Sequence, residues 1–223
     1  VRTFCFFRKN NSIKIKEIKS FYMSHIKKAT SPNLYNQSST SLIFEDDKSH
    51  QNAWAFNVED RLKELSTDEI KQNLIETSNP FSVLFENWVN DFNIASGFRN
   101  ANAFNAKEIF YIGNKRYDRR GSVGVHNYKE INWLSSFDDV IKLKEKYEFV
   151  GVDNVANSKS IYNFNWKPNT LMIFGSEGVG LTDDMIKICD HMVMIPQYGS
   201  VRSLNASTAS GIVMFDFMSK YQK

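Results

Sequence analysis

Cysteine is scarce in this sequence: Cys5 and Cys189 are the only two among 223 residues. Two cysteines so far apart provide neither a zinc-binding spacing nor a disulfide framework, so we expect no bound metal and a reducing, cytoplasmic location. His126 and His191 also stand alone, and core or surface roles suit them better than metal binding.

Long apolar runs are missing as well. None approaches the roughly 18 residues of a membrane-spanning helix, so we expect no membrane partner. The apolar residues in the first ten positions are interrupted by charge and precede no small-residue cleavage site. We therefore expect no signal peptide.

Neither sign of charge is in large excess, because 28 Lys and Arg residues face 25 Asp and Glu residues and give a net charge of +3. This mild basicity permits binding to nucleic acid without requiring it. Apolar residues make up 42% of the chain and aromatic residues 14%. That composition can fill the core of one α/β domain with an extension, or of at most two small domains.

Residues 1–79 are predicted to form an N-terminal extension that is partly disordered or helical and is a candidate for RNA contact. Lys and Arg cluster in residues 2–28, which suits an RNA-contacting arm and a solvated tail equally well. The apolar spacing over residues 57–78 predicts a pair of helices. Ser66 followed by Glu69 fits a capping box, so we expect the second helix to begin there.

From Pro80 onward, short apolar runs alternate with amphipathic segments, which predicts an α/β domain over residues 80–223. The alternation indicates a mostly parallel sheet with helices on both faces, and such sheets bind ligands beyond the carboxyl ends of their strands. Gly97 lies inside a predicted helix, where it favours close packing. The predicted strands are Phe81–Phe85, Glu108–Ile112, Phe149–Val152, Leu171–Phe174 and Met192–Ile195. The predicted helices are Asn93–Phe104, Ser136–Tyr147, Thr182–Cys189 and Ser203–Tyr221.

Two glycine-containing loops follow the last two predicted strands. The first, Gly175–Gly180, has the spacing G-x-x-G-x-G, which is neither the dinucleotide fingerprint nor a P-loop. Glu177 in its centre would repel phosphates. The second loop, residues 196–202, enters a helix that begins with small residues. Together the loops indicate a ligand that approaches the backbone closely and is not a triphosphate, although a glycine-rich loop alone is as often a plain turn.

Three stretches resemble the three motifs of the SpoU/TrmH family of RNA ribose 2′-O-methyltransferases, part of the SPOUT superfamily. The first is SVLFENWVNDFNIASGFRNANAF, with Asn93 and Arg99 at motif positions. The second is MIFGSEGVGL, with Glu177. The third is IPQYGSVRSLNASTASGI, with Ser203 and Asn205. Their order and spacing match the family over about residues 80–221.

The resemblance implies a fold with a deep trefoil knot at its C-terminal end, S-adenosylmethionine as cofactor, and a homodimer. It implies that the catalytic residues are Arg99, Asn93, Glu177, Ser203 and Asn205. It also implies a cofactor site made by Phe174, Gly175, Ser176, Glu177, Gly178, Ile195, Pro196, Gly199, Ser203, Leu204 and Asn205. Arg116, Arg119 and Arg120 lie in a basic loop between the first two motifs and are our candidates for RNA contact.

RNA rather than DNA is the expected partner, because the 2′-hydroxyl exists only in RNA. The short helical extension favours tRNA as substrate, with rRNA as the alternative. A second hypothesis is a non-catalytic RNA-binding protein built on the knot; the motif residues argue against it. A dinucleotide-dependent enzyme on an open sheet is disfavoured by the glycine spacing.

Overall fold

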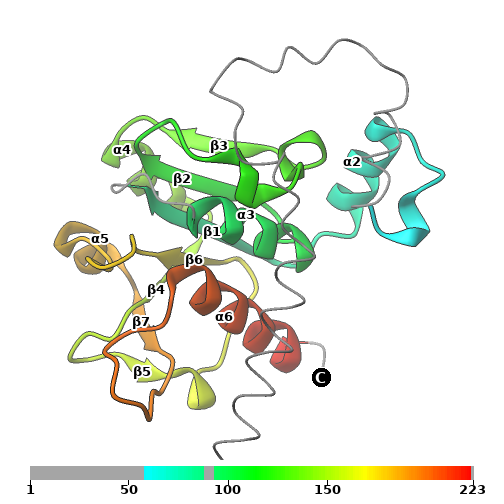
Figure 1. Cartoon of the computed structure of the whole chain (residues 1–223). Helices are drawn as coiled ribbons and strands as arrows, with labels where there is room; N and C mark the ends of the chain where they lie inside the picture. Colours follow the sequence, from blue (N-terminus) through cyan, green and yellow to red (C-terminus); the bar gives the residue numbers. More distant parts are fainter. Residues whose placement is uncertain (1–57, 88–92, 222–223) are drawn as a thin grey trace, which may run out of the picture. The chain divides into compact units, whose positions relative to one another are not determined.

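Strands from across the chain form one parallel sheet in the computed structural model, which describes residues 58–87 and 93–221. Within these residues the strand order is β3-β2-β1-β6-β4-β7-β5, and every neighbouring pair is parallel (Figure 1). The prediction of a mostly parallel sheet is confirmed. The strands are β1 (Phe81–Asn87), β2 (Ile109–Gly113), β3 (Ile131–Leu134), β4 (Glu148–Val152), β5 (Lys159–Ser160), β6 (Thr170–Phe174) and β7 (His191–Met194).

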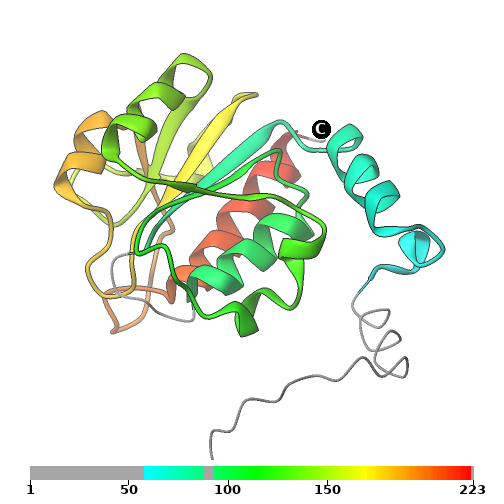
Figure 2. The same ribbon diagram turned by 90° about the horizontal axis from the view of Figure 1, so that it is seen from above.

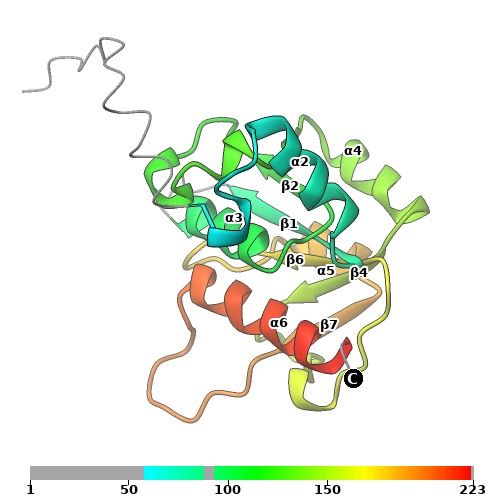
Figure 3. The ribbon, with the colours of Figure 1, turned by 90° about the vertical axis from the view of Figure 1, so that its right-hand side faces the viewer.

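Helices cover both faces of this sheet. Helices α3 (Asn93–Ala103) and α6 (Ala206–Tyr221) lie side by side on one face. Helices α4 (Phe137–Lys142) and α5 (Asp183–Ile188) lie on the other face (Figures 2 and 3). Thr182, with which the predicted helix begins, caps α5 by accepting a hydrogen bond from the backbone N–H of Met185.

The strand residues alternate between the two layers, as the period of two in a β-strand requires. Phe81, Val83 and Phe85 of β1 belong to the apolar core beneath α3 and α6, whereas Leu84 belongs to the core beneath α4 and α5. All seven residues of β1 are buried, because it is flanked by β2 and β6 and covered on both faces. Burial on both faces accounts for the apolar character of the central strands.

Gly97 lets α3 approach β1 closely. A Cβ atom added at this position would lie 2.5 Å from Cε1 of Phe85. Phe85 cannot easily move, because its ring stacks on Phe174 with centroids 5.1 Å apart and lies 5.5 Å from Phe98. The packing role predicted for Gly97 is therefore confirmed.

Helix α2 (Thr67–Glu76) begins at the predicted capping box. The Ser66 side chain accepts from the backbone of Glu69, and the Glu69 carboxylate accepts from the Ser66 backbone N–H at 2.8 Å. The predicted helix before Ser66 is wrong: only a short 3-10 turn, η3 (Asp60–Leu62), occurs within residues 58–65. No side chain caps that turn, so nothing local extends it.

Several boundaries differ from those predicted. Strands β3 and β5 are absent from the predicted strands. The basic loop predicted between the first two motifs contains two 3-10 helices, η4 (Arg119–Ser122) and η5 (Val125–Asn127). The last helix begins at Ala206 and not at Ser203, because the Asn205 side chain caps it by accepting from the Thr208 backbone N–H at 3.2 Å. The predicted basic arm in residues 2–28 lies outside the described residues. Across residues 58–87 and 93–221, no helix combines the length and apolar character needed to span a membrane.

Candidate active site

A cavity of about 500 Å³ opens at the carboxyl ends of β4, β6 and β7. It is lined by the three loops that follow these neighbouring strands, which is where a parallel sheet is expected to bind a ligand. Of the residues predicted to hold a cofactor, eight line it: Phe174, Gly175, Ser176, Glu177, Gly178, Ile195, Ser203 and Leu204. Pro196, Gly199 and Asn205 belong to the same loops but do not line this cavity.

The glycines of the first loop shape one wall of the cavity. Ser176 and Gly180 pair across the loop, with N···O distances of 3.1 and 2.9 Å. Gly178 and Gly180 have φ angles of 83° and 76°, which side chains rarely adopt. A Cβ atom on Gly178 would meet nothing within 4 Å, so this wall faces open space. Backbone groups thus border a cavity whose size is typical of small-molecule sites.

The loop is held to the sheet by buried contacts. The Ser176 hydroxyl donates to the backbone carbonyl of Glu86 at 2.8 Å. The Glu86 carboxylate, only 4% exposed, accepts from both the backbone N–H and the hydroxyl of Thr182, at 2.8 and 2.7 Å. These bonds fix both ends of the segment between β6 and α5.

Glu177 joins the three sequence motifs. Its Oε2 accepts from Asn93 Nδ2 at 3.2 Å, from Asn205 Nδ2 at 3.4 Å and from the backbone N–H of Ala206 at 2.9 Å. Asn205 Nδ2 also donates to Asn93 Oδ1 at 2.7 Å. Residues 84 and 112 positions apart in the chain therefore meet in one hydrogen-bonded cluster beside the cavity.

Asn100 fixes the two helices that carry this cluster. Its Nδ2 donates to the backbone carbonyl of Ser207 at 2.7 Å and to the Ser210 hydroxyl at 3.0 Å. A Cβ atom on Gly211 would lie 3.3 Å from the same nitrogen. The small residues of α6 therefore pack closely against α3 within one chain.

Arg99 and Ser203 are exposed, Arg99 on α3 and Ser203 at the cavity. Among the residues that the structure describes, no hydrogen bond joins Arg99 to Asn93, Ser203 or Asn205. The assignment of Arg99 and Ser203 as catalytic residues therefore stays a prediction. What the structure brings together is Asn93, Glu177 and Asn205.

The predicted RNA-contacting arginines lie in or before η4, which packs against α3. Arg116, Arg119 and Arg120 are all exposed. Hydrogen bonds from Arg120, with Nε 3.0 Å from the carboxylate, lower the pKa of Asp118 to about 2. Arg120 therefore carries its charge beside a carboxylate.

Sequence reasoning missed other residues that line the cavity. Asp153 and Asn154 follow β4, and Gln197 and Arg202 lie in the loop after β7. The only available signal was their place at the ends of predicted parallel strands. In the described part of the chain, no group of three or more His, Cys, Asp and Glu side chains is placed to hold a metal ion.

Comparisons with known proteins agree with the geometry. A sequence model of the SpoU rRNA Methylase family matches residues 80–215. A tRNA (guanosine(18)-2′-O)-methyltransferase of Aquifex aeolicus is 26% identical over 168 residues, covering 71% of this chain and 76% of that enzyme. The 23S rRNA (guanosine-2′-O-)-methyltransferase RlmB of Haemophilus influenzae is 22% identical, covering 70% of this chain and 66% of RlmB. The SpoU methyltransferase AviRb of Streptomyces viridochromogenes, solved with AdoMet, is 25% identical with a TM-score of 0.59, covering 68% of this chain and 62% of AviRb.

Proposed function

The chain belongs to the SpoU rRNA methylase family, and from this we propose that it transfers the methyl group of S-adenosylmethionine to a ribose 2′-hydroxyl of RNA. The observation that carries the proposal is the cluster of Asn93, Glu177 and Asn205 beside a cavity of about 500 Å³. Residues from all three motifs meet there, next to a wall of backbone groups.

The residues present fit this cofactor. Gly175, Ser176 and Gly178 offer backbone groups, and Ile195 and Leu204 offer apolar surface, in a cavity of suitable size. When bound, the cofactor supplies a methyl group on a positively charged sulfur. The task of the protein is to place the ribose hydroxyl and to help remove its proton.

Arg99 is our candidate for activation of the hydroxyl. A guanidinium remains protonated in proteins, so we assign it the stabilisation of the developing alkoxide and the anchoring of an adjacent phosphate. Exposure of Arg99 on α3 leaves it accessible to RNA. Glu177 is engaged through Oε2 with the start of α6, which favours a positioning role for it over that of proton acceptor.

Replacing Arg99 tests the proposal. We expect Arg99→Ala to abolish methyl transfer to RNA while S-adenosylmethionine still binds, and Arg99→Lys to restore little activity, because only the guanidinium is planar and bidentate. Calorimetric titration of the cofactor and transfer of a labelled methyl group measure the two effects. Arg61→Ala, another exposed arginine, is the matched control. Normal turnover by Arg99→Ala would contradict the assignment.

We place tRNA ahead of rRNA as the substrate because a short helical segment, with α2, precedes the methyltransferase domain. Relatives named for tRNA and for rRNA match this chain at similar identity. Incubation with labelled cofactor and separate tRNA and rRNA pools distinguishes the two. Labelling of neither pool, together with failure to bind the cofactor, would leave the non-catalytic RNA-binding alternative.

A C-terminal trefoil knot and a homodimer complete the proposal. Support for the knot comes from the family to which the chain belongs. Contacts of α6 with residues 161–166 bring the last helix against the segment between β4 and β6. Exposed Phe215 and Ile212 on the outer face of α6 support a second chain there. Light scattering in solution measures the number of chains.

A further inference from the structure

Asp153 has a central position at the cavity. It is the first residue after β4, the strand between β6 and β7 in the sheet. Its backbone N–H donates to the carbonyl of Val193 in β7 at 3.0 Å. Its carboxylate accepts from the backbone N–H of Leu181 at 2.8 Å and from that of Asn154 at 2.7 Å. Asp153 thus connects the end of β4 to β7 directly, and to the segment that follows β6 through Leu181.

Gly180 is matched to this carboxylate. A Cβ atom on Gly180 would lie 2.3 Å from Asp153 Oδ2, closer than any side chain tolerates. The φ angle of 76° at Gly180 turns the backbone so that the following N–H, of Leu181, meets the carboxylate. The last glycine of the loop Gly175–Gly180 therefore makes room for a negative charge at the cavity wall.

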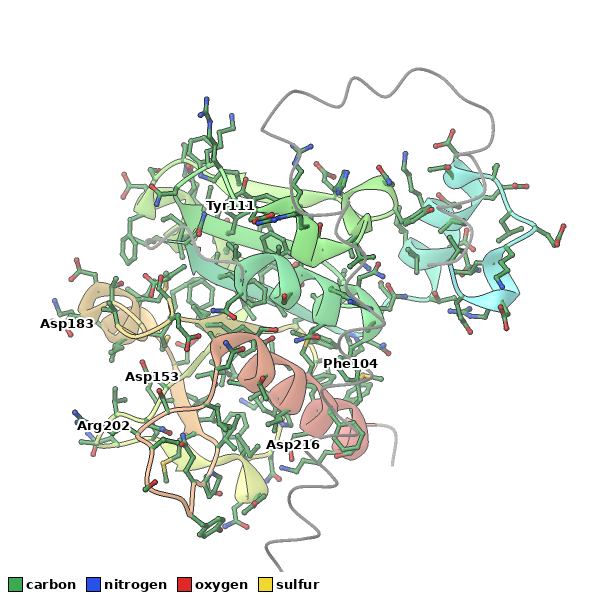
Figure 4. All side chains as sticks on the ribbon, in the orientation of Figure 1. Phe104, Tyr111, Asp153, Asp183, Arg202 and Asp216 are labelled. Carbon is green, nitrogen blue, oxygen red and sulfur yellow. The ribbon has the colours of Figure 1, made fainter. Side chains whose placement is uncertain are left out.

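The cavity carries more negative than positive charge although the chain as a whole is basic. Its charged lining residues are Asp153, Glu177 and Arg202. Glu177 is engaged with the start of α6, and the Arg202 side chain is exposed. Figure 4 shows Asp153 and Arg202 on the same side of the molecule, near the loop that precedes α6. Asn154 Nδ2 donates to the Arg202 backbone carbonyl at 3.3 Å, which ties this loop to the residue next to Asp153.

We propose that Asp153 is a specificity-determining residue that makes the site prefer the cationic cofactor over its product. This inference rests on the proposed function. S-adenosylmethionine carries a methyl group and a positive charge on its sulfur. S-adenosylhomocysteine lacks both, and the two molecules are otherwise the same. A carboxylate at the cavity wall stabilises the first relative to the second. The same carboxylate holds the loop through Leu181, so its loss weakens both ligands but the cationic one more.

The experiment measures dissociation constants of both ligands by isothermal titration calorimetry. For Asp153→Asn, we expect the ratio of the S-adenosylhomocysteine constant to the S-adenosylmethionine constant to fall by about fivefold relative to the unsubstituted protein. Asp138→Asn removes the same charge from an exposed residue of α4 and is expected to leave the ratio unchanged. Thermal unfolding without ligand shows whether each variant is folded.

Equal weakening of both ligands in Asp153→Asn would overturn the proposal and leave Asp153 a purely structural role. If the unsubstituted protein binds neither ligand, the proposed function itself fails. If Asp153→Asn does not fold, the same ratio of dissociation constants is measured for Asp153→Ser. A serine hydroxyl can accept hydrogen bonds from nearby backbone N–H groups without carrying charge. An unchanged ratio in the serine variant would equally overturn the proposal.

Discussion

At the scale of single residues, Glu177 connects the cavity wall to α6. The first backbone N–H groups of a helix have no partner within it, and the positive end of the helix dipole lies there. The Glu177 carboxylate satisfies the N–H of Ala206, the first residue of α6, at 2.9 Å. Charge and hydrogen bonding therefore act at the same point, where the third motif meets the second.

We expect Glu177→Ala to lower the free energy of unfolding by about 1–3 kcal/mol, because the N–H of Ala206 and the amides of Asn93 and Asn205 lose their common acceptor. Glu177→Gln keeps the shape of the side chain and one acceptor oxygen, so we expect it to lower the free energy of unfolding by less. Urea unfolding followed by circular dichroism measures both. Equal stability of Glu177→Ala and the unsubstituted protein would show that the contact contributes nothing.

Lys129 is a buried residue that makes the stability of the protein depend on pH. Burial lowers the pKa of the Lys129 ammonium to about 8, from an ordinary value of 10.5. Its Nζ donates to Asn105 Oδ1 at 2.6 Å. The unfolded chain binds the proton more tightly than the folded chain, so this residue raises stability as the pH rises from about 8 to 10.5.

The matched variant is Lys129→Met, which has no titrating group. We expect the unfolding free energy of the unsubstituted protein, relative to this variant, to increase by about 1–3 kcal/mol between pH 7.5 and pH 10.5. Other titrating groups are common to both proteins and cancel in the difference. A difference that does not vary with pH would show that Lys129 reaches water freely in the folded protein.

At the scale of elements, the pair α3 and α6 brings the first and third motifs together. Small residues allow this packing: Gly97 lets α3 lie close to β1, and Ser207, Ser210 and Gly211 of α6 lie against Asn100 of α3. Close approach places Asn93 and Asn205, at the starts of the two helices, within hydrogen-bonding distance. The geometry of the site therefore depends on helix packing.

Gly97→Ala and Gly211→Ala test this packing as a pair. At either position, alanine stabilises a helix by roughly 1 kcal/mol relative to glycine. At Gly97 the added methyl group would meet the Phe85 ring at 2.5 Å, so we expect Gly97→Ala to lower the free energy of unfolding by about 1–3 kcal/mol. At Gly211 the nearest atom is 3.3 Å away, at the amide of Asn100, and we expect a change near zero. Thermal unfolding compares them; equal effects would contradict the packing difference.

Elements that depend on neighbouring residues could be predicted from the sequence. The caps of α2 and α5 involve residues that are only a few positions apart in the sequence: Ser66 with Glu69, and Thr182 with Met185. The central strands have the continuous apolar runs that are typical of buried parallel strands. Strand β5 could not be predicted, because its two residues, Lys159 and Ser160, are defined only by pairing with β7.

The same limit applies to the candidate site. The loops around the cavity could be located from the motifs and from their places after predicted parallel strands. The part played by Asp153 could not, because its carboxylate meets the N–H of Leu181, 28 positions later, only after β4 is placed between β6 and β7. The catalytic role of Arg99 stays a prediction, because Arg99 is exposed on α3 and its role concerns an RNA substrate and not a contact within the chain.

At the scale of the whole molecule, hydrogen bonds join the last helix, α6, to residues 161–166, which lie about 50 positions earlier in the chain. Asp216 of α6 accepts from Trp166 Nε1 at 2.7 Å and from Lys220 Nζ at 2.8 Å. Lys220 Nζ also donates to the carbonyl of Phe164 at 3.3 Å. Residues 161–166 precede β6, so these bonds join the end of the chain to the segment between β4 and β6.

Replacing Asp216 tests how much this connection contributes. We expect Asp216→Ala to lower the free energy of unfolding by about 2–4 kcal/mol, because Trp166 and Lys220 lose a shared, largely buried acceptor. Asp216→Asn can still accept a hydrogen bond from the indole N–H, so we expect it to lower the free energy of unfolding about half as much. Ser219→Ala, an exposed neighbour in the same helix, is the control. If α6 is held chiefly by its apolar face on the sheet, Asp216→Ala will unfold at the same urea concentration as the control, and the tie to residues 161–166 will have no part in stability.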